Sequence, residues 1–318
     1  MSLYVDKSNE VLEEIQKAVI GKDDCLKKVM MAILSKGHIL IEDIPGVGKT
    51  TLALAFSKVM NLEHNRVQFT PDVLPSDILG FSMYQKKKGK FTYQPGPVMC
   101  NLFLADEINR TSPKTQSALL EVMEEGSVTV DGITRDVPAP FIVIATQNPV
   151  GSAGTQKLPE SQLDRFMICM SMGYPDMQSE ITIAKGRSIS SPIDALAPLL
   201  DKDTLTAMQQ EVEQVFVHDV IFSYIAELVT ATRKHRLLEL GVSPRGTIAL
   251  TKMAKARAFL AGRDYATPND VSSIFKDVVA HRLRMNSQAR MVKTSVNDIL
   301  NDILNQTVKP APQNNDMR

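Results

Sequence analysis

The sequence has no tryptophan, only three cysteines in 318 residues, and no excess of charge of either sign. The cysteines, Cys25, Cys100 and Cys169, lie far apart in apolar surroundings, which favours buried reduced thiols over a disulfide or zinc framework. Because 36 basic residues balance 36 acidic ones, no global field attracts the chain to nucleic acid or to an anionic membrane. Any such binding would have to be local.

Long apolar runs are also missing. No stretch approaches the roughly 20 apolar residues that cross a bilayer, and the N-terminus lacks the basic segment and the apolar segment of a signal peptide. We therefore predict a cytoplasmic protein without membrane insertion. Hydrophobic residues still make up 43% of the chain, which is enough for a folded core. The 318 residues exceed the length that a single hydrophobic core usually stabilises, so we expect a main domain and a smaller one.

Short apolar runs alternate with helical patterns over the first half of the chain, as in a parallel sheet covered by helices on both faces. Two stretches interrupt this alternation, residues 81–93 and 127–137, and the second has the Asp131-Gly132 signal of a hairpin. Helical patterns alone follow from about residue 177. We predict an α/β core over residues 1–176, a helical domain over 177–308 and a disordered tail over 309–318. The predicted strands are His38–Ile41, Val67–Phe69, Leu102–Ala105, Phe141–Ala145 and Met167–Met170.

A phosphate-binding loop is predicted between the first strand and the helical pattern that follows it. Glycines let consecutive backbone N–H groups surround phosphate oxygens, and the helix that follows directs its partial positive charge at the same anion. Lys49 would reach the β- and γ-phosphates, and the Thr50 hydroxyl would bind Mg²⁺. The full pattern has glycine where this chain has Asp43, so the first turn must be made another way, for example by Pro45. The nucleotide-binding residues of the loop are Pro45, Gly46, Val47, Gly48, Lys49, Thr50 and Thr51.

Two acids, Asp106 and Glu107, directly follow the apolar strand at 102–105. Carboxylates at the end of a buried strand usually lie at the carboxyl edge of the sheet, where open α/β folds bind ligands. Asp106 fits a magnesium partner, and Glu107 fits the base that polarises the attacking water. Asn148 follows the next strand and could orient that water. The pair could also lie in a surface loop, and Asn148-Pro149 could be a simple turn. His38 is expected to be a packed residue.

These motifs, in this order, resemble those of a MoxR-type AAA+ ATPase. The resemblance covers residues from about 10 to 285. It implies a five-stranded sheet in the order 5-1-4-3-2, a helical lid, ATP and Mg²⁺ as cofactors, and a homo-hexameric ring with ATP at the subunit interfaces. The matching segments are Gly46–Thr50, Asp106–Arg110, Thr146–Pro149, Leu163–Phe166 and Ser243–Arg245.

The resemblance also implies roles for single residues. Asn148 would sense the γ-phosphate, Arg165 would be the arginine finger given to the neighbour's nucleotide, and Arg245 would be the lid's sensor of ATP. Ile20 and Gly21 would contact adenine. Residues 81–93 and 127–137 would face the pore of the ring. Arg110 could be a second interface residue or a helix cap.

Three functions remain open. The favoured one is an ATPase that remodels or matures protein partners, or inserts a metal cofactor into them, and a separate von Willebrand factor A-domain protein is the implied partner. A nucleic-acid motor or loader is the second, because Lys86, Lys87, Lys88 and Lys90 could touch phosphates, although the neutral net charge makes nucleic acid an unfavoured partner. An ATP-gated scaffold is the third. Glu107, Asn148 and Arg165 together argue for turnover instead.

Overall fold

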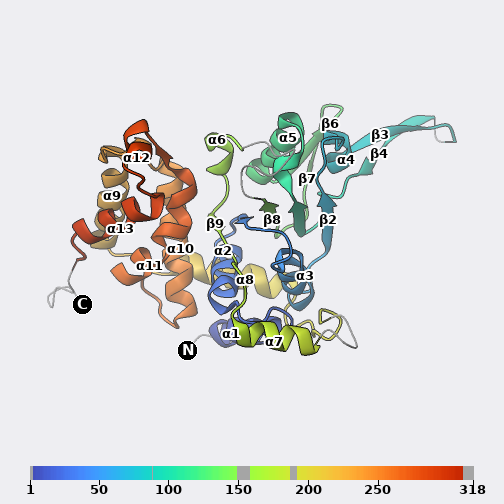
Figure 1. Ribbon diagram of the computed structural model, residues 1–318. Helices are drawn as coiled ribbons and strands as arrows, with labels where there is room; N and C mark the ends of the chain where they lie inside the picture. Colours follow the sequence, from blue (N-terminus) through green and yellow to red (C-terminus); the bar gives the residue numbers. More distant parts are fainter. Residues whose placement is uncertain (1–2, 88, 149–157, 187–191, 311–318) are drawn as a thin grey trace. The chain divides into compact units, whose positions relative to one another are not determined.

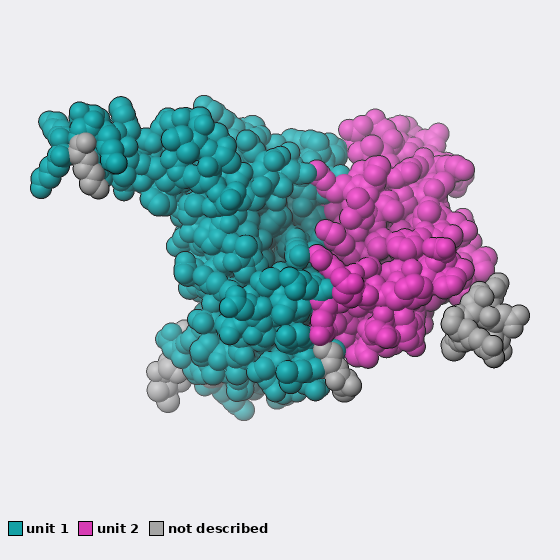
Figure 2. Space-filling view, turned by 180° about the vertical axis from the view of Figure 1, so that it is seen from behind, with its two compact units in different colours: residues 1–210 teal, residues 211–318 magenta. Residues whose placement is uncertain are grey.

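The computed structural model describes residues 3–87, 89–148, 158–186 and 192–310 (Figure 1). The chain divides into two compact units, Met1–Gln210 and Glu211–Arg318, which Figure 2 shows in different colours. The predicted domain boundary between residues 176 and 177 stays a prediction. Of the predicted tail, residues 311–318 lie outside the described residues. No helix among the described residues has the length and apolar character that crossing a bilayer requires.

The first unit is built on a five-stranded parallel sheet in the order β2-β5-β8-β1-β9. The strands occur along the chain as β1, β2, β5, β8 and β9, so this order is the predicted 5-1-4-3-2 read from the other edge, and the predicted fold class is confirmed. Parallel strands end at the same edge, and here β1, β5 and β8 end there in polar residues. The strand bounds are Ile39–Glu42 (β1), His64–Gln68 (β2), Leu102–Asp106 (β5), Ile142–Gln147 (β8) and Ile168–Met170 (β9).

Helices cover both faces of this sheet. On one face Leu40, Phe103 and Val143 pack against Leu119 and Leu120 of α5 within a single buried cluster. On the other face α3 contacts β5, and α1 packs on both α2 and α3. The helices of this unit are α1 (Leu3–Gln16), α2 (Asp23–Leu34), α3 (Lys49–Val59), α4 (Pro75–Leu79), α5 (Pro113–Glu125), α6 (Glu160–Leu163), α7 (Met177–Gly186) and the first part of α8 (Lys202–Gln214).

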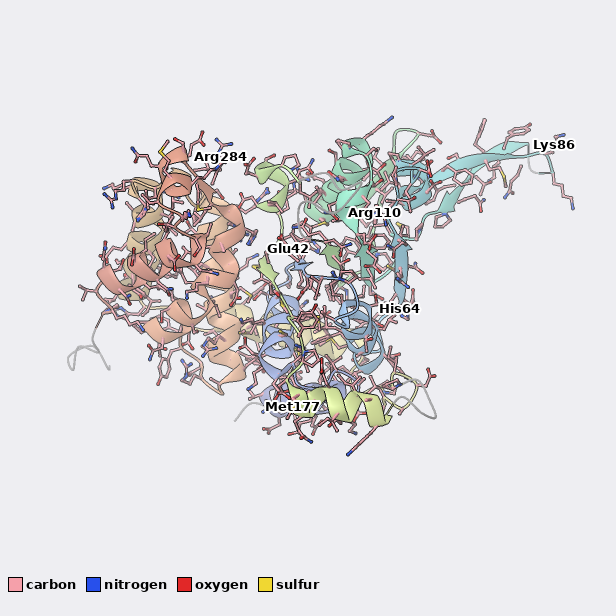
Figure 3. All side chains as sticks on the ribbon, viewed as in Figure 1. Glu42, His64, Lys86, Arg110, Met177 and Arg284 are labelled. Carbon is pink, nitrogen blue, oxygen red and sulfur yellow. The ribbon has the colours of Figure 1, made fainter. Side chains whose placement is uncertain are left out.

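Each predicted interruption of the alternation is an antiparallel hairpin. The first consists of β3 (Gly80–Gln85) and β4 (Lys90–Pro95), and the second of β6 (Ser127–Val130) and β7 (Ile133–Asp136). The guanidinium of Arg135 lies 4.1 Å from the ring centre of Tyr93, which brings the second hairpin against the base of the first. The β3–β4 hairpin extends away from the sheet, with Lys86 near its tip (Figure 3). Lys88 lies outside the described residues.

His38 is a packed residue, as predicted, and joins the sheet to α5. Its Nδ1 accepts a hydrogen bond from the Val143 N–H at 3.0 Å, so Nε2 carries the proton and donates to the Met123 carbonyl at 3.0 Å. Burial lowers the pKa of His38 to about 4, against the smaller opposing effects of the Met123 carbonyl and Glu124. The imidazole is therefore neutral at physiological pH.

The second unit is helical, as predicted, with the addition of a short antiparallel ribbon between β10 and β11. Leu250, Met253, Ile274 and Phe275 are almost completely buried where α10 packs on α11. The elements are α9 (Asp219–Lys234), β10 (Leu238–Leu240), α10 (Pro244–Leu260), α11 (Pro268–Val279), β11 (Arg284–Met285), α12 (Ser287–Met291) and α13 (Val296–Gln306).

Candidate functional site

The predicted phosphate loop connects β1 to α3. Gly46 and Gly48 have φ values of 88° and 96°, in the left-handed region that residues with a side chain rarely adopt. A Cβ atom on Gly46 would meet nothing within 4 Å, so the loop faces open space at this position. α3 begins at Lys49, and the first N–H groups of a helix have no acceptor within it. The loop is therefore suited to an anion such as phosphate.

Asp43, which replaces the usual glycine, anchors the start of this loop. Its Oδ2 accepts hydrogen bonds from the Ser171 hydroxyl at 2.8 Å and from the N–H groups of Met172 and Gly173 at 2.7 Å each. Its Oδ1 accepts one from the Ile44 N–H at 2.8 Å. Burial raises the pKa of Asp43, but these hydrogen bonds outweigh it and hold the pKa below its ordinary value. The first turn is thus fixed by the carboxylate itself, while Pro45 is exposed.

Lys22 binds carbonyl groups of the same segment, residues 171–174. Its buried ammonium donates to the carbonyls of Met172, Gly173 and Tyr174 at 2.7, 2.9 and 2.8 Å. Lys22 directly follows Ile20 and Gly21, the residues assigned to adenine, and Gly21 has a left-handed φ of 70°. The segment after β9 therefore ties the predicted adenine-binding residues to the start of the phosphate loop.

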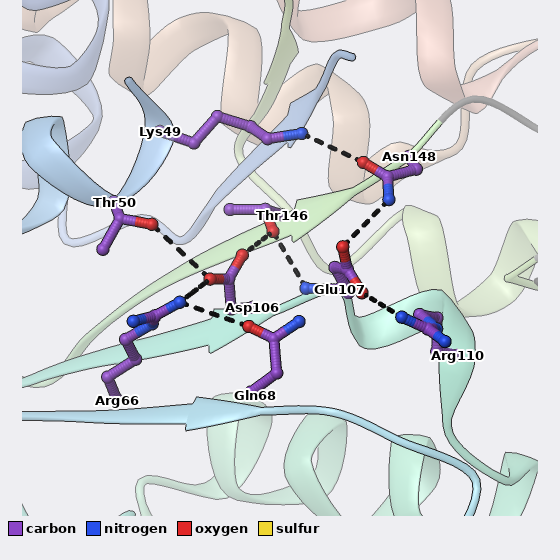
Figure 4. Close-up of polar contacts among 9 residues, drawn as sticks. All are labelled: Lys49, Thr50, Arg66, Gln68, Asp106, Glu107, Arg110, Thr146 and Asn148. Atoms are coloured by element: carbon purple, nitrogen blue, oxygen red, sulfur yellow. Dashed lines mark hydrogen bonds and ion pairs between the residues drawn. The ribbon is translucent and has the colours of Figure 1, made fainter. Parts of the chain in front are cut away.

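Lys49 is buried at the start of α3, and its ammonium points along the carboxyl edge of the sheet. It donates to the Asp43 carbonyl at 2.5 Å and to Asn148 Oδ1 at 3.4 Å (Figure 4). Burial lowers the pKa of Lys49 below its ordinary value, although nearby carboxylates, Asp43 foremost, oppose the shift. An ammonium in this setting gains from an added anion, because phosphate charge would replace the water lost on burial.

Asp106 ends β5 with its two oxygens in different environments (Figure 4). Its Oδ1 accepts from the Thr146 hydroxyl at 2.6 Å. Its Oδ2 lies 3.5 Å from Thr50 Oγ1 and accepts from Arg66 Nη2 at 2.7 Å and Nε at 3.2 Å. The carboxylate therefore faces the first turn of α3 with Oδ2.

Glu107 adopts a left-handed φ of 58° immediately after the strand. Its N–H donates to Thr146 Oγ1 at 2.9 Å, so Thr146 joins both members of the acidic pair. Its Oε1 accepts from the Asn148 amide at 3.0 Å, and its Oε2 accepts from Arg110 Nη1 at 2.8 Å. Lys49, Asn148 and Glu107 thus form one continuous series of contacts.

Comparisons with known proteins identify the family of this chain. Residues 38–168 match the family described as ATPase family associated with various cellular activities (AAA), and residues 230–303 match the AAA lid domain. The chain is also 37% identical to chaperone MoxR1 of Mycobacterium tuberculosis, in an alignment of 306 positions that covers 93% of this chain and 81% of that protein. The chain belongs to the MoxR-type AAA+ ATPases.

Two further relatives cover almost the whole of this MoxR-type ATPase. The protein YeaC of Bacillus subtilis is 46% identical over 302 residues, which are 95% of this chain and 94% of that protein. A solved crystal structure of a candidate ATPase from Cytophaga hutchinsonii has a TM-score of 0.88 at 36% identity and covers 97% of this chain and 96% of its own. The likeness therefore includes both units.

The predicted arginine finger Arg165 of this MoxR-type ATPase contacts α5 and is not part of the Lys49–Asn148–Glu107 series. Arg165 Nη1 donates to the Leu120 carbonyl at 2.5 Å, and its Nε lies 3.6 Å from Glu124, so its recorded partners are on α5. Arg245 is exposed in the first turn of α10, in the second unit. Of the predicted motif around Asn148, Pro149 lies outside the described residues. The roles of all these site residues stay predictions.

The oxygens of Thr50 and Asp106 fit the magnesium ion that AAA+ ATPases usually bind with ATP. Mg²⁺ takes oxygen ligands, keeps several waters and uses one or two carboxylates together with substrate phosphates. A hydroxyl and a carboxylate facing each other at 3.5 Å supply such a pair. The described residues contain no larger group of acidic, histidine or cysteine side chains suited to a metal, and Mg²⁺ with a nucleotide does not require one.

Sequence reasoning assigned no role to two residues of this site and left the role of a third undecided. Arg66 lies on an edge strand with no local motif, and only the pairing of β2 with β5 brings it to Asp106. Thr146 had a weak signal, because a polar residue inside a buried strand needs a partner. Arg110, predicted as an interface residue or a cap, contacts Glu107, and its role stays a prediction.

Proposed function

We propose that this protein binds Mg-ATP at the phosphate loop and hydrolyses it at the edge where β1, β5 and β8 end. The observation that supports this most strongly is the continuous contact series Lys49–Asn148–Glu107, beside Thr50 and Asp106. It joins a phosphate-binding cation, a polar amide and a carboxylate base at one edge of the sheet. A structural ion-pair network would not require an open glycine loop beside it.

Each loop residue has a distinct task in this proposal. The N–H groups around Gly46, Val47 and Gly48 donate to phosphate oxygens, and the Lys49 ammonium neutralises the β- and γ-phosphates. Pro45 and Thr51 border this surface, and Ile20 and Gly21 contact the adenine ring. Thr50 and Asp106 hold Mg²⁺. Held by these two side chains, the ion would offset the negative charge that develops on the phosphates during hydrolysis.

Glu107 is the general base in the proposed reaction. It accepts a proton from the attacking water, a contribution of roughly 10²–10⁴ in rate. Asn148 holds the Glu107 carboxylate through its amide and accepts from Lys49 through its oxygen, so it orders the base relative to the phosphates. Arg110 binds the second carboxylate oxygen and must give way if that oxygen is to receive the proton.

The proposed site is completed by a neighbouring subunit. Arg165 contacts α5 and is not part of the contact series, which supports a role at the nucleotide of an adjacent copy. Such an arginine finger contributes roughly 10³–10⁵ in turnover, so a lone subunit would be a poor ATPase. We propose a homo-hexameric ring in the cytoplasm, with Arg245 of the lid responding to ATP.

We propose that hydrolysis drives remodelling, maturation or metal-cofactor insertion in a protein partner, such as a separate von Willebrand factor A-domain protein. The exposed apolar side chains of the β3–β4 hairpin support a polypeptide partner, since Phe81, Met83, Tyr84 and Phe91 are each about half exposed or more. The relative named chaperone MoxR1 points the same way.

A nucleic-acid motor is the second candidate. The exposed Lys86, Lys87 and Lys90 lie next to the contacting rings of Tyr84 and Phe91, 5.4 Å apart, and lysines with aromatic rings can bind single strands. The two candidates differ in salt dependence, because binding through phosphates weakens steeply as salt rises. The neutral net charge favours the protein partner.

Replacing Glu107 by Gln tests the proposed chemistry. Glutamine keeps the size and the contact with Asn148 but cannot accept the proton, so ATP binding should persist while turnover falls by roughly 10²–10⁴. Unchanged turnover would remove Glu107 from the role of base. Equally slow turnover in the wild-type protein, with normal binding, would favour the ATP-gated scaffold.

A further inference from the structure

Arg66 is a cation in direct contact with the carboxylate assigned to magnesium. It lies on β2 at the edge of the sheet, and its side chain is 47% exposed. Its guanidinium binds Asp106 Oδ2 through both Nη2 and Nε, at 2.7 and 3.2 Å. This is the same oxygen that faces Thr50 Oγ1 at 3.5 Å (Figure 4).

The fold does not depend on this ion pair. The ladder between β2 and β5 runs from His64 opposite Leu102 to Gln68 opposite Asp106, and backbone hydrogen bonds hold it whether or not the guanidinium is paired. The orientation of Asp106 is set separately by the Thr146 hydroxyl on Oδ1. A partly exposed ion pair of this kind contributes little stability.

The contact conflicts with a metal at the same place. A dication held by Thr50 and Asp106 Oδ2 would lie beside the guanidinium, and like charges at such short range repel strongly. Arg66 must therefore rotate away when the metal site fills. Its Nη2 already donates to Gln68 Oε1 at 3.2 Å, so an acceptor for the displaced guanidinium is within reach.

We propose that Arg66 is the counter-ion of Asp106 in the metal-free protein and competes with Mg²⁺ for Oδ2, so that it sets the Mg²⁺ concentration at which nucleotide binds tightly. This rests on the proposed function, because it takes the phosphate loop as the nucleotide site. Arg66 occupies Asp106 Oδ2 before the metal arrives, and its release accompanies the filling of the site.

Replacement of Arg66 by Gln should lower the Mg²⁺ concentration needed for half-maximal binding of ADP. Loss of a partly exposed ion pair predicts a shift of about 1.5- to 5-fold. Without Mg²⁺, in EDTA, removal of a positive charge near the phosphates should leave the affinity unchanged or weaker. Arg66→Lys keeps the charge and should stay close to the wild-type protein under both conditions.

The measurement is isothermal titration calorimetry of ADP at a series of Mg²⁺ concentrations and in EDTA. Arg284→Gln is the matched control, because Arg284 forms an exposed ion pair with Glu239 at 3.0 Å in the other unit. Thermal melting of each variant confirms folding, and the Lys variant still tests the charge requirement if the Gln variant unfolds.

The outcomes separate the two proposals. Tighter binding of ADP by Arg66→Gln in the presence of Mg²⁺, but not in EDTA, supports competition between Arg66 and Mg²⁺. Weaker binding by Arg66→Gln at every Mg²⁺ concentration would indicate that Arg66 is a phosphate ligand and would overturn the inference. An unchanged Mg²⁺ dependence in Arg66→Gln would also overturn it, and so would a shift of equal size in Arg66→Lys. If the wild-type protein bound no ADP with Mg²⁺ present, the proposed function itself would fail.

Discussion

Replacing Asp43 by Gly would restore the usual phosphate-loop pattern, yet we expect it to destabilise this protein. The carboxylate accepts from the N–H groups of Met172 and Gly173 and from the Ser171 hydroxyl. A donor left without an acceptor on burial costs about 1–3 kcal/mol, so the two N–H groups alone predict a loss of about 2–6 kcal/mol in the free energy of unfolding. Asp43→Asn can keep an oxygen acceptor for these donors and should therefore lose less stability than Asp43→Gly.

The assay is urea denaturation at pH 7, followed by circular dichroism. Asp24→Asn is the matched control, because Asp24 is 79% exposed in an ion pair with Lys28 and its loss should change stability by less than about 0.5 kcal/mol. The pKa of Asp43 is below its ordinary value, so its contribution is complete above pH 3.8 and disappears only as pH falls through the lower native pKa. A glycine variant as stable as the wild-type protein would refute the reasoning.

Three further predictions concern stability and assembly. The pKa of His38 is about 4 in the folded protein and 6.5 in the unfolded chain. As pH falls from 6.5 to 4, the unfolded imidazole takes up a proton and the free energy of unfolding should decrease by up to about 3 kcal/mol. His38→Gln should lose this pH dependence when denaturation is measured over the same range. Asp270→Asn should lower the free energy of unfolding by about 3–5 kcal/mol in urea denaturation, because it leaves Arg263 of the second unit without its bidentate carboxylate. A decrease of less than about 1 kcal/mol would contradict this. Arg165→Ala mixed with Lys49→Ala should recover part of the ATPase activity that each lacks alone, and no recovery would argue against an arginine acting on a neighbour's nucleotide.

The central strands and the phosphate loop could be predicted because their signals are local. Leu102–Ala105 and Phe141–Ala145 are apolar runs, and the structure extends each by the polar residues at its carboxyl end. The prediction was least accurate for the edge strand β2, which was predicted at Val67–Phe69 and spans His64–Gln68. β2 exposes polar side chains such as His64 and Asn65, so no apolar run marks its start.

The missing parts of the site depend on contacts between residues distant in sequence. Asp43 could be recognised as a departure from the pattern, but its partners at 171–173 follow a strand that joins the sheet much later in the chain. Arg66 likewise meets Asp106 only through strand pairing. Local patterns predict elements and motifs, whereas the partners of a charged side chain depend on the sheet order.

The most direct test of the central claim is calorimetric titration of ATP with Mg²⁺ into the wild-type protein and Lys49→Ala, with circular dichroism to confirm that both are folded. A charge-assisted contact to phosphate contributes about 1.5–3 kcal/mol, so the variant should bind roughly tenfold more weakly or worse. Saturable binding by the wild-type protein and this loss in the variant are the predicted results. Equal binding by both proteins, or no binding by the folded wild-type protein, would contradict the account.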